Sequence, residues 1–278
     1  SSGTLPANGA IPQERNKRKM AFPPILYGPE SMAYDTYAVV SPAPGQIGAG
    51  LPINYRHRHP LGKQLVLEDG RKFRFGAAGA STLVVGDALT AGVATASQQN
   101  LTAAAGAIND RFATMTTGAS SARNLFAEGF LVVSVTPGGG DTYKIANHLL
   151  MTTAAGDIVN FAPGHALRRA LTTTSRLDLI PNPYFALIQS PATTVASTPM
   201  GVAISAPTTL RACWIQTRGV VGALTSGTAI AGDVAGTGLG TGGAIGPIGA
   251  IATQPIFGFV VFAAATGAWS TFFLTIDG

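Results

Sequence analysis

Residues 126–150 read FAEGFLVVSVTPGGGDTYKIANHLL, and this stretch decides the fold. Residues 126–135 are rich in aromatic and β-branched side chains, which favour strands. A proline and three glycines follow at positions 137–140, a composition typical of a turn. Residues 142–150 then have the composition of a returning strand. The stretch therefore predicts two antiparallel strands joined by a tight turn.

Short apolar runs separated by turn residues extend from this stretch in both directions. Upstream, residues 64–67 and 72–75 flank Asp69-Gly70, and Asp-Gly is a strong hairpin signal. Downstream, strands are predicted at residues 157–161, 175–179, 184–189, 202–205, 210–217, 255–263 and 270–276. Residues 98–117 are the only stretch with helical character, and Gly106 weakens it. Many short strands at regular spacing predict an all-β fold with a β-sandwich or barrel-like body.

Three regions are predicted along the chain. Residues 1–60 contain nine prolines, which exclude a long helix, and we expect a long extended N-terminal arm that becomes ordered by lying on a neighbour. Residues 61–123 are predicted to form a small β unit with room for a short helix. Residues 124–278 are predicted to form the main β domain.

A short pattern recurs at three places as VVGDAL (residues 84–89), AAGDIV (residues 154–159) and IAGDVA (residues 230–235). Glycine supplies the positive φ of a tight turn, and the aspartate that follows it can accept hydrogen bonds from nearby backbone amides. Each copy therefore predicts a sharp corner that leads into a strand, and not a catalytic aspartate.

The composition points to a surface that other subunits cover. Hydrophobic residues make up 46% of the chain but charged residues only 11%, against about 25% in an average soluble domain. Monomeric proteins usually keep mixed charges on their surface to prevent association. The chain is too hydrophobic for a disordered protein, it contains no apolar run long enough for a transmembrane helix, and it does not begin with a secretory signal pattern. Cys213 is the only cysteine, so no internal disulfide is expected.

We expect no catalytic, cofactor or metal site. A formal G-x-G-x-x-G occurs at Gly238, Gly240 and Gly243, but more glycines follow it instead of a helix, and no acidic residue lies between positions 233 and 277. Residues 236–249 are therefore predicted to form a flexible loop or tip. His57 and His59 would share one side of an extended segment but lack further ligands nearby. Cys213 lies beside Trp214 in an apolar strand, where a lone thiol is usually inert. The chain also contains no G-x-S-x-G motif of a serine nucleophile.

Basic residues are concentrated in the predicted arm. The chain carries a net charge of +5 and has a pI of about 9.6. Because these residues gather in the arm and not on an aromatic-lined face, we expect them to dock on an acidic protein surface and do not expect nucleic acid as a partner. The predicted contact residues are Arg15, Lys17, Arg18, Lys19, Arg56 and Arg58, and His57 and His59 extend the same polar strip.

Residues 61–278 resemble the head decoration, or capsid cement, proteins of tailed bacteriophages. The resemblance lies in EGFLVVSVTPGGGDTYKIANH, DIVNF, RLDLIPNPYFALIQ, TTLRACWIQTRGVVGALTSGTAIAGDVAG and PIFGFVVFAAATGAWSTFFLTID. It implies a non-enzymatic virion protein that is assembled in the host cytoplasm, binds the major capsid protein on the outer surface of an icosahedral capsid, and stabilises it, commonly as a homotrimer. It implies neither a cofactor nor a membrane partner. The long arm departs from the compact small members of this group.

Two alternatives remain open. The chain could be another virion component, either the major capsid protein, which would need a long spine helix at residues 98–117, or a tail or fibre subunit. It could also be a β-sandwich carbohydrate-binding protein or hydrolase, which would need exposed aromatic side chains such as those of Trp214 and Trp269.

Overall fold

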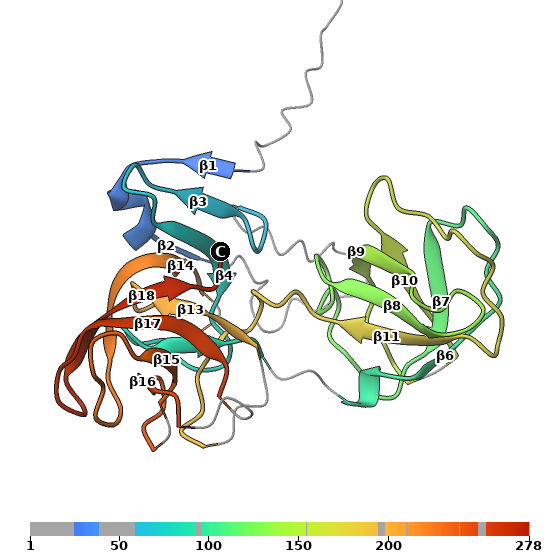
Figure 1. Ribbon diagram of the computed structural model, residues 1–278. Coiled ribbons are helices and arrows are strands. Elements are labelled where there is room, and N and C mark those ends of the chain that lie inside the picture. The colour runs from blue at the N-terminus through green and yellow to red at the C-terminus, as the bar shows by residue number, and fades with distance from the viewer. Residues whose placement is uncertain are drawn as a thin grey trace, which may run out of the picture.

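The strand pair predicted within residues 126–150 is present in the computed structural model. Strands β8 (Phe130–Val135) and β9 (Thr142–His148) pair antiparallel, with Phe130 opposite Lys144 and Val132 opposite Thr142. The structure describes residues 25–38, 59–92, 96–153, 155–193, 198–209, 211–238, 240–249 and 254–277. These residues form two β units that lie side by side in Figure 1. The all-β prediction is confirmed.

The first unit is a closed barrel with the strand order β10-β7-β6-β11-β8-β9. Its remaining strands are β6 (Leu101–Ala103), β7 (Phe112–Thr116), β10 (Ala155–Phe161) and β11 (Arg176–Ile180). Alternate side chains point inward, so that Leu131 and Val133 of β8 are fully buried while their neighbours are exposed or half-buried. The rings of Tyr143 and Phe161 stack inside, with centroids 4.8 Å apart.

A buried histidine ties the barrel to the loop before β8. The Nε2 atom of His148 accepts the backbone N–H of Phe126 at 3.0 Å, and its Nδ1 atom lies 2.7 Å from the backbone oxygen of Leu149. A neutral ring with its proton on Nδ1 satisfies both contacts. Burial lowers the pKa of His148, so the ring is held neutral.

The second unit is a 12-stranded sheet whose main path runs β1-β3-β4-β14-β18-β17-β15-β16. Its strands are β1 (Ile25–Tyr27), β2 (Thr36–Ala38), β3 (Gln64–Val66), β4 (Lys72–Ala77), β5 (Ala88–Thr90), β12 (Ile188–Gln189), β13 (Pro199–Ala203), β14 (Arg211–Leu224), β15 (Val234–Thr237), β16 (Ile245–Pro247), β17 (Ile256–Phe262) and β18 (Trp269–Thr275). Two short 3-10 helices complete the described elements: η1 (Glu30–Tyr34) and η2 (Ala96–Gln98). The long strand β14 organises the sheet, because its first half pairs with β4 and its second half with β18.

The barrel is an insertion in the sheet unit. The chain leaves the sheet after β5 and returns at β12, where Ile188 lies opposite Thr90. Glu128 of the barrel accepts the backbone N–H of Leu61 at 2.8 Å, which links the two units. The predicted boundary between residues 123 and 124 falls inside the barrel. The predicted boundary assumes that each unit is continuous in the chain. This assumption fails because the barrel strands lie between β5 and β12 of the sheet unit.

Two further predictions differ from the structure. Apart from Gln98, which ends the short helix η2, residues 98–117 carry strands β6 and β7 and not a helix, because Ala113 and Met115 point into the barrel core while Phe112 and Thr116 are exposed. Within the predicted arm, residues 25–38 belong to the sheet: β1 pairs parallel with β3, and β2 pairs antiparallel with β14. Residues 1–24 and 39–58 lie outside the described residues.

The glycines of the three predicted Gly-Asp corners, Gly86, Gly156 and Gly232, all have positive φ, at 82°, 104° and 95°, but only the first and the third are confirmed as corners that lead into a strand. The first corner leads into β5 and the third into β15, whereas the second forms a bulge at the start of β10. Asp87 of the first corner is buried and accepts the side-chain amide of Gln189 at 2.8 Å. Burial raises the pKa of the Asp87 carboxyl.

Candidate interaction surface

The basic residues predicted to contact a partner cannot be placed. Arg15, Lys17, Arg18, Lys19, Arg56 and Arg58 lie outside the described residues, as does His57. His59 is described, and its ring packs in an aromatic cluster, 5.2 Å from the Phe75 centroid and 5.3 Å from that of Trp214. The half-buried His59 ring therefore contributes to the packing of the sheet unit, and its place in a polar contact strip stays a prediction.

Neither a thiol site nor a metal site is found where the structure has been described. Cys213 is fully buried, and burial raises the pKa of its thiol to about 12, so the reactive thiolate is disfavoured. Across the described ranges, no group of three or more His, Cys, Asp or Glu side chains could hold a metal ion. None of the described helices is long and apolar enough to cross a membrane.

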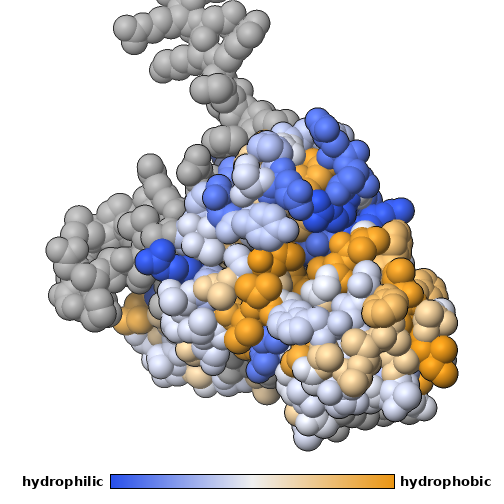
Figure 2. All heavy atoms as spheres, turned by 90° about the vertical axis from the view of Figure 1, so that its left-hand side faces the viewer, coloured by the Kyte–Doolittle hydropathy of each residue, from blue (hydrophilic) through white to orange (hydrophobic). Residues whose placement is uncertain are grey.

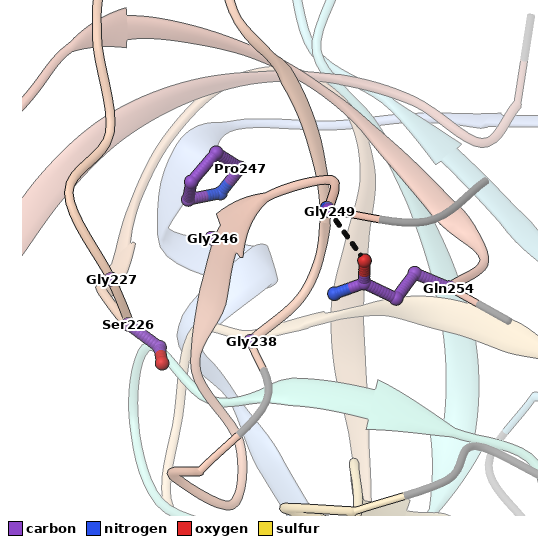
Figure 3. Close-up of a pocket in the computed structure, with 7 residues that line it drawn as sticks. All are labelled: Ser226, Gly227, Gly238, Gly246, Pro247, Gly249 and Gln254. Atoms are coloured by element: carbon purple, nitrogen blue, oxygen red, sulfur yellow. Dashed lines mark hydrogen bonds between the residues drawn. The ribbon is translucent and has the colours of Figure 1, made fainter.

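The glycine-rich segment forms a hairpin of β15 and β16, where the sequence predicted a loop or tip. A hollow of about 240 Å³ lies beside this hairpin (Figure 3) and is lined by Ser226, Gly227, Gly238, Gly246, Pro247, Gly249 and Gln254. None of these seven lining residues carries a charge. The Gln254 amide is already engaged, since it accepts the backbone N–H of Gly249 at 2.7 Å and donates to the backbone oxygen of Thr237 at 2.9 Å. The glycines here serve close backbone packing, because a Cβ on Gly246 would lie 2.3 Å from the backbone oxygen of Ser226.

The strongest candidate for a functional surface is an apolar row on the open face of the sheet. Val220 of β14 lies opposite Phe273 of β18, Phe273 lies opposite Phe259 of β17, and Phe259 lies opposite Val234 of β15. Directly opposed residues share one face of a sheet. The exposed fractions of Val220, Phe273, Phe259 and Val234 are 50%, 39%, 46% and 38%. We call these four residues the apolar row.

The strands of this row are apolar on both faces. Neighbouring side chains such as Phe272, Leu274 and Val260 point inward and are buried in the core. Strands that are hydrophobic on both faces are typical of sheets covered on both sides. Within the described residues, the outer face here has no cover. The row spans three strand spacings, or about 14 Å.

Further exposed hydrophobic side chains extend this face. Val261, Phe262 and Trp269 are each about half exposed or more, and the Trp269 ring lies directly against Gly86. A Cβ on Gly86 would lie 1.7 Å from a Trp269 ring carbon. Figure 2 views the molecule from the left-hand side of Figure 1 and shows hydrophobic side chains gathered below a hydrophilic zone.

A second hollow, of about 530 Å³, lies at the β14 end of the apolar row. Its lining residues are Asp69, Gly70, Arg71, Arg218, Gly219, Val220 and Phe273, and we call it the Arg218 hollow. The guanidinium of Arg71 is engaged with two carboxylates: its Nε lies 2.6 Å from Asp69 and its Nη2 lies 2.7 Å from Glu30. The backbone N–H and the guanidinium of Arg71 both donate to Asp69 and hold the pKa of that carboxyl below its usual value.

The sequence predicted β17 and β18 of this surface, at residues 255–263 and 270–276, but the strand predicted at residues 210–217 ends before Val220, and the surface itself was missed. The available signal was the run IFGFVVF, which is apolar at successive positions and so carries hydrophobic side chains on both faces of β17. Comparison with known proteins does not add to this signal, because no family model, curated protein or solved structure matches the chain.

Proposed function

We propose that the chain is a structural virion protein that binds the outer surface of an icosahedral phage capsid and stabilises it. The apolar row is the observation that carries this proposal. Single exposed hydrophobic residues are ordinary, but contiguous apolar patches usually mark protein interfaces. The low charge content and the resemblance to capsid decoration proteins support the same function.

In this proposal the major capsid protein covers the apolar row. A ligand that binds the assembled lattice more tightly than it binds free subunits stabilises the lattice by linkage. A homotrimer would present three apolar rows to the capsid at once, and such multivalency turns modest single contacts into strong binding. The open face of the sheet would then be covered only on the particle.

The test is binding to capsids that lack the protein, taken from the phage whose genome encodes it. Purified chain is mixed with these particles and sedimented, and the bound fraction is measured over a range of concentrations. We expect saturable binding and a higher temperature of capsid disruption in its presence. Absence of binding, or binding without any stabilisation of the particle, would refute the proposal.

The basic arm is a separate part of the proposal. Residues Arg15, Lys17, Arg18 and Lys19 are expected to contact the capsid, with Arg56 and Arg58 as further contacts. A chain that lacks residues 1–19 should fold normally but bind capsids more weakly, and more so at low salt, where charge contacts are strongest. Equal affinity of the truncated and full chains would show that these residues do not take part.

The exposed Trp269 favours a second candidate function, the binding of a carbohydrate. Its side chain is 54% exposed, and sugar-binding proteins often present such aromatic platforms. A glycan array probed with the native chain and with Trp269→Ala separates the two functions, since only a carbohydrate-binding protein would give a signal that the substitution removes. The third alternative, a major capsid protein, has lost its only candidate spine helix, because residues 98–117 carry β6 and β7.

A further inference from the structure

The Arg218 hollow combines apolar walls with a cation that forms no ion pair with a carboxylate of the described residues. Val220 and Phe273 form its apolar side, and both also belong to the apolar row. Within the part of the chain that the structure describes, the Arg218 guanidinium donates one long hydrogen bond, of 3.4 Å, to the backbone oxygen of Asp277. No carboxylate of the described residues lies within ion-pair distance of it.

The other charged groups of the hollow are already satisfied. Arg71 holds Asp69 and Glu30, and the carboxylate of Asp277 is engaged by Arg74, whose Nε lies 2.6 Å from it. Arg218 therefore supplies the charge that is left to meet a ligand. The Asp69 carboxylate in the lining would oppose a second negative charge, so the hollow suits a single carboxylate better than a phosphate dianion.

The shape of the hollow depends on Gly219. This residue has a φ of 89°, and a Cβ there would lie 2.9 Å from the Cγ of Arg71. The aliphatic stem of Arg71 can therefore pack against the β14 backbone, which leaves open space between Arg71 and Arg218. A guanidinium beside apolar walls binds a carboxylate through paired hydrogen bonds and in partly desolvated surroundings, where the ion pair is stronger than on an open surface.

We propose that the Arg218 hollow binds an acidic side chain of the partner segment that covers the apolar row. The partner segment would carry hydrophobic side chains over Phe259 and Phe273 and an aspartate or glutamate next to them. This inference rests on the proposed docking function and adds the chemistry by which the partner is recognised. The apolar row would supply most of the contact area, and Arg218 would fix the register and orientation of the partner.

Peptide binding to the full chain tests this inference without the capsid. The probes are acetyl-Phe-Val-Phe-Glu-amide, the same peptide with Gln in place of Glu, and acetyl-Phe-Val-Phe-Gln with a free C-terminal carboxylate. Binding is followed by NMR of isotope-labelled protein, at the Arg218 Nε–H and Phe273 ring signals. Arg218→Gln is compared with Arg211→Gln, a matched control that removes an exposed arginine from the same strand but away from the hollow.

We expect the Glu peptide to bind native protein at least tenfold more tightly than the Gln peptide. This preference should vanish in Arg218→Gln, persist in Arg211→Gln and shrink as salt is added. Equal binding of the Glu and Gln peptides would overturn the proposal, and so would a preference for the free terminal carboxylate over the Glu side chain. If no peptide moves the Arg218 and Phe273 signals, the hollow is not the recognition site, and capsid sedimentation still decides the docking function on its own.

Discussion

If the apolar row docks on a capsid as proposed, replacement of Phe259 by serine should weaken capsid binding without unfolding the protein. Phe259 lies in the middle of the apolar row and is 46% exposed. A phenylalanine buries roughly 200 Å² when fully covered, so docking would remove about 90 Å² of its surface from water. At about 25 cal/mol per Å², this is about 2 kcal/mol for each contact. The affinity of a single contact should therefore fall roughly 30-fold.

Phe112→Ser is the matched control for this substitution. Phe112 is 43% exposed and also lies in a strand, but it belongs to β7 of the barrel. The assay is titration of fluorescently labelled chain against capsids that lack the protein, with thermal unfolding of each variant as a check of folding. The reasoning is refuted if Phe259→Ser binds as tightly as the native chain, or if Phe112→Ser weakens binding to the same extent.

Three further predictions concern stability. Asp277→Asn should lower the free energy of unfolding in urea by about 2 kcal/mol. It removes the negative charge that pairs with Arg74 and turns an amide NH2, a donor, toward one of the two guanidinium N–H groups that now donate at 2.6 and 3.0 Å. An unchanged urea midpoint would contradict this. His148 has a lowered pKa in the folded chain, so protons bind the unfolded chain first and stability should fall as pH drops below about 6.5. Urea unfolding at pH 7.5 and 5.5 checks this, and His148→Gln, which can still accept the Phe126 N–H, should lose that part of the pH dependence. Asp87 has a raised pKa, so its charge opposes folding at neutral and higher pH. Asp87→Asn should raise the melting temperature more at pH 8 than at pH 5, and a lower melting temperature at pH 8 would count against this assignment.

The sequence was sufficient to predict local strands and turns, but not the insertion of one β unit into the other. Turn chemistry located the β8–β9 pair, the hairpin at Asp69-Gly70 and the Gly-Asp corners, because these features depend on neighbours in the chain. The insertion of the barrel could not be found in this way. It depends on the pairing of Thr90 with Ile188, and no local pattern encodes a contact over that separation.

The candidate surface was hidden for a related reason. An apolar strand such as β17 indicates burial on both faces, and the sequence alone does not say whether the same chain or another one provides the cover. The pairing of Phe259 with Phe273 and Val234 was needed to show that the outward residues form one row. The Arg218 hollow could not be predicted from the sequence either, because Arg71 and Arg218 approach each other only after β4 and β14 have paired.

The way in which the barrel joins the sheet unit offers a use in protein engineering. Its entry and exit strands, β5 and β12, are hydrogen-bonded neighbours, so any folded cargo whose own ends lie close together can be spliced between them. The join involves none of the four side chains of the apolar row. A chimaera of this kind would carry an enzyme or an antigen in place of the native barrel and keep the apolar row intact.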